Sequence, residues 1–232
     1  MQVEIKYHPD YTLALVTLAK NERLQTEAGA MVGMTPNMDM ATQAKGGVKH
    51  SLGRSIFGGE SFFLNTYTGK KDGDVVALAA ALPGDMEVIE LNGETLLVQS
   101  GSYLASSEGI KIDTKWEGAK NFFSGAGFIM LQVSGHGTLI ISSYGAIHKM
   151  TLAPKQRFIV DTGHLISFHE GMDFKVKKVG GWKSTLLSGE GFVVDLEGPG
   201  EFFLQTRNPP WLISWINKHI PHDYSSNQSS SS

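Results

Sequence analysis

Two short glycine motifs occur three times each in this chain, always in the same order. The first motif has a polar and a small residue before its glycine and ends in two apolar residues; its copies span 27–32, 99–104 and 161–166. The second motif matches without a gap at 56–64, 122–130 and 186–194. A recurrence of this kind indicates several copies of one structural unit. We therefore divide the chain into approximate repeats 1–78, 79–142 and 143–207.

Each repeat is expected to be a β unit. The first motif is typical of a turn that opens into a strand. The second motif has apolar residues on both sides of a glycine, which is typical of a strand that is buried on both faces and bent at the glycine. The equivalent core residues would be Phe62, Phe128 and Phe192. We predict an all-β fold with three internally repeated units and pseudo-threefold symmetry, of double-stranded β-helix or sandwich type, forming a single domain over 1–222.

One helix is predicted, at 209–219, near the C-terminal end. Pro209 suits the first turn of a helix and Pro221 follows its end. The helix carries more apolar surface than a free helix should expose, so it must dock. We expect docking on its own β core first, then on a neighbouring subunit, and least on a membrane surface. The interface candidates are Trp211, Leu212, Trp215 and Ile216. The serine-rich tail 223–232 is expected to be disordered.

Charge and cysteine content narrow the classes of function. The formal net charge is −3, which gives no general basic field for nucleic acid, so DNA is excluded as a partner and RNA is disfavoured. The chain has no cysteine, and therefore no disulfide, thiolate metal site or cysteine nucleophile. Because we find no signal peptide and no apolar run long enough to span a membrane, we expect a cytoplasmic protein.

No catalytic motif is found. The histidines show no metal-ligand spacing; His164 and His169, for example, would point to opposite faces of a strand. We expect no bound metal and no cofactor. Glu60 and Glu190 stand at equivalent repeat positions and could act as paired carboxylates, but hydrogen bonding to backbone at a bend explains them better.

A basic cluster in a glycine-rich connection is the remaining candidate for a binding site. It consists of Lys45, Lys49, His50 and Arg54. These side chains could hold an anionic group or a partner surface. A solvated loop accounts for the same residues.

The segment 46–65, which includes this cluster, resembles the signature of the altered inheritance of mitochondria protein 24 family, and the resemblance extends over 1–207. It implies a fold similar to the trp RNA-binding attenuation protein superfamily. Eukaryotic members are mitochondrial and associated with inner-membrane organisation, whereas this chain begins at its first predicted strand without a transit peptide. The family supplies no catalytic residues to carry over.

Together these features predict a non-enzymatic scaffold or assembly protein that forms a homo-oligomer and can contact a protein partner or the cell envelope. The first alternative is a cupin-like β protein that binds a metal or small molecule, as an enzyme or otherwise. The second is an RNA-binding protein, by analogy of fold alone.

Overall fold

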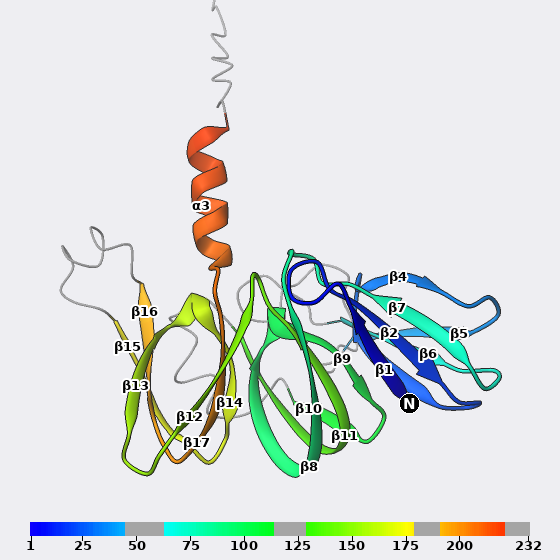
Figure 1. Ribbon diagram of the computed structural model, residues 1–232, viewed down its shortest axis with the longest axis horizontal. Helices are drawn as coiled ribbons and strands as arrows, with labels where there is room; N and C mark the ends of the chain where they lie inside the picture. Colours follow the sequence, from blue (N-terminus) through cyan, green and yellow to red (C-terminus); the bar gives the residue numbers. More distant parts are fainter. Residues whose placement is uncertain (45–62, 114–128, 179–190, 221–232) are drawn as a thin grey trace, which may run out of the picture.

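The computed structural model describes residues 1–44, 63–113, 129–178 and 191–220, and most of its regular structure is antiparallel β-sheet (Figure 1). The predicted mostly β fold with one short C-terminal helix is confirmed. In chain order the elements are β1 (Gln2–Lys6), β2 (Leu13–Leu18), β3 (Arg23–Glu27), β4 (Met31–Met34), β5 (Asp39–Ala44), β6 (Phe63–Thr68), β7 (Asp74–Leu78), β8 (Met86–Gln99), η1 (Ser100–Ser102), β9 (Tyr103–Ser107), β10 (Ile110–Asp113), β11 (Met130–Ser142), β12 (Ile147–Leu152), β13 (Arg157–Asp161), η2 (Thr162–His164), β14 (Leu165–His169), β15 (Asp173–Lys178), β16 (Phe192–Glu197), β17 (Gly200–Gln205) and α3 (Pro209–His219).

The strands form three sheets. A four-stranded sheet has the order β1-β2-β7-β4, and a three-stranded sheet has the order β13-β16-β15. A ten-stranded sheet runs β12-β17-β14-β8-β11-β9-β3-β6-β5, with β10 paired to β11, and its two ends share buried clusters with the three-stranded and the four-stranded sheet. Figure 1 shows the three-stranded sheet at one end of the long axis and the four-stranded sheet at the other.

Burial alternates along the two inner strands of the four-stranded sheet, β2 and β7. In β2 the residues Ala14, Val16 and Leu18 are buried while their neighbours are half-buried, and β7 alternates in the same way. Each fully buried leucine contributes roughly 1.5–3 kcal/mol relative to an exposed one. The buried apolar residues form three clusters, and the middle cluster takes Leu64 from β6 and Ile166 from β14. The cores are therefore shared between segments far apart in sequence.

Three bends are capped in a similar way by a side chain seven residues before a first-motif glycine. Two of them are the β2–β3 and β12–β13 connections, which lead from one sheet to another, and the third is an irregularity within β8. Glu22 accepts a hydrogen bond from the backbone N–H of Ala19 at 2.8 Å. Glu94 accepts one from Asn92 at 2.9 Å, and Gln156 accepts one from Ala153 at 2.9 Å. Each cap fixes the geometry of its turn.

The three first motifs lie at junctions between strands. β3 ends at Glu27, β8 at Gln99 and β13 at Asp161, and a short turn or 3-10 segment then leads into β4, β9 and β14. Each following strand has a register shift at the third residue after the motif glycine, because the pairing skips Val32, Leu104 and Ile166. Such bulges bend a strand and increase its twist.

Two of the predicted features of the second motif differ from the structure. Phe192 was expected in the core, but it is only half-buried because it begins β16 opposite Lys178, at the end of the outer strand β15. Phe63 is exposed rather than buried on both faces, next to the outer strand β5. Phe62 and Phe128 lie outside the described residues.

Candidate functional site

Three local features favour the helix α3, two at its beginning and one at its end. Asn208 has extended backbone geometry, and its side-chain oxygen accepts a hydrogen bond from the N–H of Trp211 at 3.4 Å. Pro209 and Pro210 occupy the first two helical positions, where no intrahelical donor is needed. Lys218 and His219 lie in the last turn, where positive charge suits the helix dipole. The helix predicted at 209–219 is confirmed with the same bounds.

The base of α3 is fixed to the β13–β14 junction. Asn208, which is buried, donates from Nδ2 to Asp161 Oδ1 at 3.1 Å, and the same oxygen accepts the Gly163 N–H at 2.8 Å. Gln205 Nε2 donates to the Gly163 carbonyl at 2.8 Å. A Cβ at Gly163 would collide with the Asn208 side chain, so a larger residue there would displace the cap. Sequence analysis did not single out Asn208, although an asparagine before two prolines is a typical N-cap.

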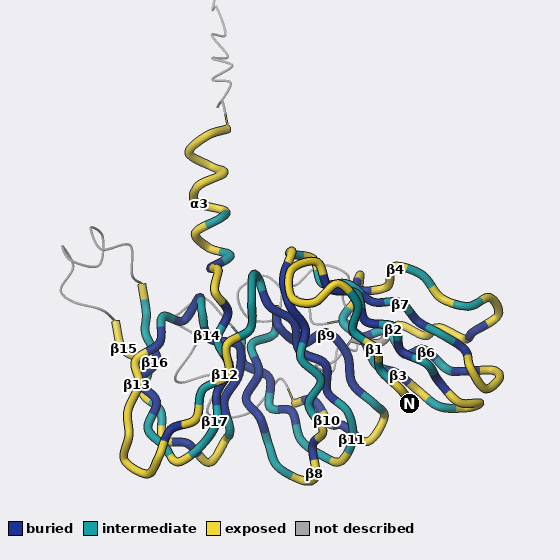
Figure 2. Tube along the Cα trace, in the orientation of Figure 1, coloured by how far each residue is buried: buried dark blue, intermediate teal, exposed yellow. Residues whose placement is uncertain are grey.

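Beyond this base α3 makes no buried contact. None of its residues is buried, and both Trp211 and Trp215 expose more than half of their surface (52% and 59%). Figures 1 and 2 show the helix projecting away from the sheets, exposed along most of its length. The expectation that α3 docks on its own β core is therefore wrong in this structure, because the Asn208 cap directs the chain away from the sheets.

The apolar side chains of α3 lie on a broad face. At 100° per residue, Trp211, Leu212, Trp215, Ile216 and His219 share one side of the helix. Ser214 and Asn217 lie on the opposite side together with Ile213, and Lys218 lies beside Trp211 at the edge of the apolar face. The Trp215 and His219 rings are in contact, with centroids 4.5 Å apart. Of the predicted interface residues, Trp211, Trp215 and Ile216 are exposed and Leu212 is half-buried, so this face is available for contact.

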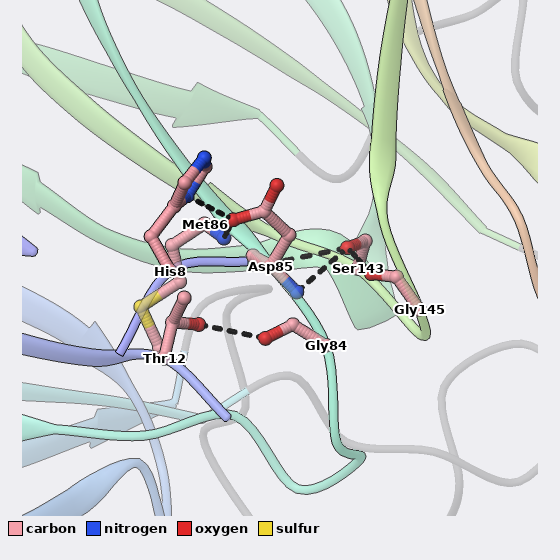
Figure 3. Close-up of polar contacts among 7 residues, drawn as sticks. All are labelled: His8, Thr12, Gly84, Asp85, Met86, Ser143 and Gly145. Atoms are coloured by element: carbon pink, nitrogen blue, oxygen red, sulfur yellow. Dashed lines mark hydrogen bonds and ion pairs between the residues drawn. The ribbon is translucent and has the colours of Figure 1, made fainter. Parts of the chain in front are cut away.

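A second polar arrangement joins three loops near the centre of the molecule (Figure 3). Thr12 Oγ1 donates to the Gly84 carbonyl at 2.8 Å, and the N–H of Asp85 lies 3.1 Å from Ser143 Oγ. The buried Asp85 carboxylate contacts His8 Nδ1 at 2.7 Å. These bonds satisfy buried polar groups and connect the β1–β2 turn to the loops before β8 and after β11. We assign the network a structural role.

A shallow hollow of about 390 Å³ lies between the β14–β15 turn and the start of β17. Its lining residues include Glu94, His169, Glu170 and Glu201. Glu201 pairs with Lys149 at 2.9 Å, and Gln132 donates to Glu170, so these carboxylates already have partners. In the described part of the chain, no three His, Cys, Asp or Glu side chains are placed to hold a metal ion.

The other residues proposed from sequence are not brought together by the described structure. Lys45, Lys49, His50 and Arg54, and also Glu60 and Glu190, lie outside the described residues, as does the tail 223–232. His164 Nδ1 lies 2.8 Å from the Gln205 carbonyl, whereas His169 Nε2 lies 4.0 Å from Glu201. These two histidines therefore have separate surroundings. Within the residues described, no helix is both long and apolar enough to cross a membrane.

The fold and the site define a β protein of joined antiparallel sheets that displays one largely exposed apolar helix. The chain belongs to the family described as Mitochondrial biogenesis AIM24, whose model matches residues 3–207. The family resemblance predicted from the segment 46–65 is thereby confirmed. The helix α3 follows the matched residues.

Two relatives from Streptococcus pyogenes extend this assignment. The uncharacterized protein M6_Spy0233 of the serotype M6 strain is 25% identical over 229 residues, covering 95% of this chain and 92% of that protein. The crystal structure of protein SPYM3_0169 superimposes with a TM-score of 0.80 at 24% identity, covering 94% of this chain and 99% of that one. The second comparison supports the fold.

Proposed function

We propose that this protein is a non-catalytic scaffold in which the joined sheets form a rigid base and α3 contacts another component of an assembly. The observation that carries this proposal is that no residue of α3 is buried, although its base is held by hydrogen bonds from Asn208. An isolated helix of about 11 residues is marginal in water. Its apolar face therefore gains most if a partner surface covers it.

A protein surface suits α3 better than a lipid surface. Amphipathic helices that lie on anionic membranes usually carry several lysines or arginines on their polar face. In α3 the cationic candidates are Lys218 and His219, at its C-terminal end. Tryptophan is also among the residues that dominate protein interfaces. We place the assembly in the cytoplasm, where α3 can reach a protein partner at the inner face of the envelope.

The proposal includes three equivalent β units with pseudo-threefold character. It is supported by the three turn caps at Glu22, Glu94 and Gln156. The three bulges at the same distance from the motif glycines support it as well. In a scaffold built from repeated units, each unit contacts its neighbours, here through sheet edges. Such contacts do not depend on a catalytic centre.

The test compares the double variant Trp211→Ser/Trp215→Ser with Ser214→Ala, a control on the polar face of the same helix. Both full-length chains are expressed in the native host and fractionated on native gels. We expect the wild-type chain and the control to migrate in a larger complex, and the double variant to lose it. An unchanged complex in the double variant contradicts the assignment of α3.

Native mass spectrometry of the gently purified protein tests the two alternatives. A stoichiometric metal or metabolite adduct would favour a cupin-like binding protein, and an RNA adduct would favour nucleic-acid binding. Turnover of a metabolite that is abolished by a point change at Glu60 or Glu190 would overturn the non-catalytic assignment.

A further inference from the structure

We infer that the protein associates head to tail with copies of itself, by pairing strand β13 of one copy with strand β4 of the next. This inference deepens the proposed scaffold and rests on it for its biological purpose. The surface involved is separate from α3, so the two contacts can be tested independently.

The pairing is already used twice within the chain. In the first joint, β3 pairs with β9, and Leu24, Gln25 and Thr26 face Ser107, Ser106 and Ala105. In the second joint, β8 pairs with β14, and Leu96, Leu97 and Val98 face His169, Phe168 and Ser167. Both joints are antiparallel. The residues of each joint can be numbered from the first-motif glycines. Each joint pairs the residues five, four and three positions before one glycine with the residues six, five and four positions after the next glycine, in that order.

The same numbering identifies two strands, β13 and β4, that have no such neighbour among the described strands. The residues five to three before Gly163 are Phe158 to Val160 of β13, and those four to six after Gly29 are Gly33 to Thr35, at the end of β4. Among the described strands, β13 pairs with β16 alone and β4 pairs with β7 alone. Each strand therefore has one edge with which no described strand pairs, and the two edges are the complementary halves of one further joint.

Exposure at equivalent positions supports this complementarity. Leu104 and Ile166, at the bulges of the two joints, are fully buried (0%), whereas their counterpart Val32 on β4 is 63% exposed. The strand before the motif glycine shows the same difference. Leu97 on β8 is fully buried, whereas Ile159, at the equivalent position on β13, is 60% exposed. Apolar residues are thus uncovered at the positions where a neighbouring strand would cover them.

The two free edges also lack the usual protection against strand pairing. Outer strands of soluble proteins commonly carry charged side chains that prevent edge-to-edge association. Of the other four strands that end the path of a sheet, β1, β12 and β15 carry Glu4, Lys149 and Lys175 in their interiors, while β5 carries only Asp39, at its first residue. By contrast β4 has no charged residue, and the charges of β13 are confined to its terminal residues Arg157 and Asp161.

The partner that fits both edges is a second copy of this chain. β4 and β13 lie towards opposite ends of the long axis, so one molecule does not close the joint on itself (Figure 1). The interface is heterologous, which produces a ring or an open filament according to the rotation between copies. By the register of the two internal joints, Ile159 of one copy faces Met34 of the next, Phe158 faces Thr35, and Val160 faces Gly33.

Cross-linking tests this register directly, because the chain has no cysteine of its own. Purified Ile159→Cys and Met34→Cys chains are mixed and treated with a short bis-maleimide. We expect a covalent heterodimer at a yield several-fold above that of the control mixture of Ile159→Cys with Met40→Cys. Met40 is a suitable control because it is an equally accessible methionine on another outer strand, β5. Equal yields in the two mixtures overturn the inference.

Charged variants provide a second, non-covalent test. Ile159→Asp blocks one edge and Met34→Asp blocks the other, and both positions are exposed, so the chains should fold. We expect each variant alone to be monomeric by native mass spectrometry, while wild-type chains form larger species. The mixture should give a 1:1 dimer, because each chain retains the edge that the other lacks. A monomeric wild type, or association of either variant alone, contradicts head-to-tail pairing.

The result of the cross-linking test can be distinguished from the result of the α3 test. If Trp211→Ser/Trp215→Ser loses its complex but still cross-links from position 159 to position 34, the edges pair independently of α3. If the cross-link fails while α3 remains necessary for a complex, the scaffold proposal stands without this interface.

Discussion

Asp195 on β16 accepts a hydrogen bond of 3.1 Å from Arg157 Nε on the neighbouring strand β13. Lys177 on β15 forms an ion pair with the same carboxylate from the other side. Asp195 is almost completely buried, whereas both cations are half-exposed. A single carboxylate therefore ties together the three strands of the end sheet that presents β13.

Asp195→Asn should destabilise the protein at neutral pH and have less effect in acid. The hydrogen bond from Arg157, followed by that from Lys177, holds the pKa of Asp195 below its ordinary value. A carboxylate with a lowered pKa in the folded state contributes stability above its unfolded pKa of about 3.9, and this contribution is lost as the pH falls through the folded pKa. We expect a loss of about 2 kcal/mol near neutrality, measured by urea unfolding. An equal loss at strongly acidic pH would contradict this account.

Tyr103 should stay protonated in the folded protein at a pH where exposed tyrosines ionise. Burial raises the pKa of its phenol, whose oxygen donates to the Gln25 carbonyl at 3.3 Å across the β3–β9 joint. An unfolded tyrosine ionises near pH 10, so the stability that depends on neutral Tyr103 is present below that pH and is lost as the pH rises above it. Ultraviolet titration should show one fewer late-ionising phenol in Tyr103→Phe than in the wild type.

Gly163→Ala should loosen the base of α3, while Gly101→Ala should not. Both glycines occupy the same place in the first motif, but a Cβ at Gly163 would collide with Asn208 and one at Gly101 would meet open space. Displacing Asn208 removes the N-cap, which is worth about 1 kcal/mol. Hydrogen exchange measured by mass spectrometry should be faster in 209–219 for Gly163→Ala alone. Equal exchange in the two variants would show that the cap does not depend on Gly163.

Gly84→Ala should lower the free energy of unfolding more than Gly171→Ala does. A Cβ at Gly84 would collide with the Ser143 carbonyl oxygen and approach Gly145 N to 2.8 Å, within the loop network of Figure 3. At Gly171 a Cβ meets no atom within 4 Å. Because backbone atoms cannot move aside cheaply, we expect a cost of about 2–4 kcal/mol at Gly84 and less than about 1 kcal/mol at Gly171. Thermal unfolding of the two variants measures the difference, and similar midpoints would contradict it.

Local signals predicted the helix and the β class well. Pro209, Pro210 and Pro221 define the ends of α3 in sequence, so its bounds needed no tertiary information. Its docking could not be predicted in the same way, because the direction of the helix depends on the bond between Asn208 and Asp161, which are 47 residues apart in the chain.

Strand pairing lay beyond the sequence for a similar reason. The pattern around the motif glycines indicates strands, but it does not say which edges meet. The burial of Leu97 and the exposure of Ile159 follow from the presence or absence of a neighbouring strand, although the two residues hold the same position relative to their motif glycines. The sequence pattern alone predicts Phe192 in the core. Its position at the start of β16, opposite Lys178, depends on strand pairing that the pattern does not reveal.

The capped turns at Glu22, Glu94 and Gln156 also bear on the order of events in folding. Each cap spans two or three residues, so each bend can form locally and early. The joints bring together segments roughly 70–80 residues apart, and their closure is entropically slower. A nascent chain should therefore contain capped bends before the joints between its units have closed, and the unpaired β3 and β8 edges would be exposed in the interval.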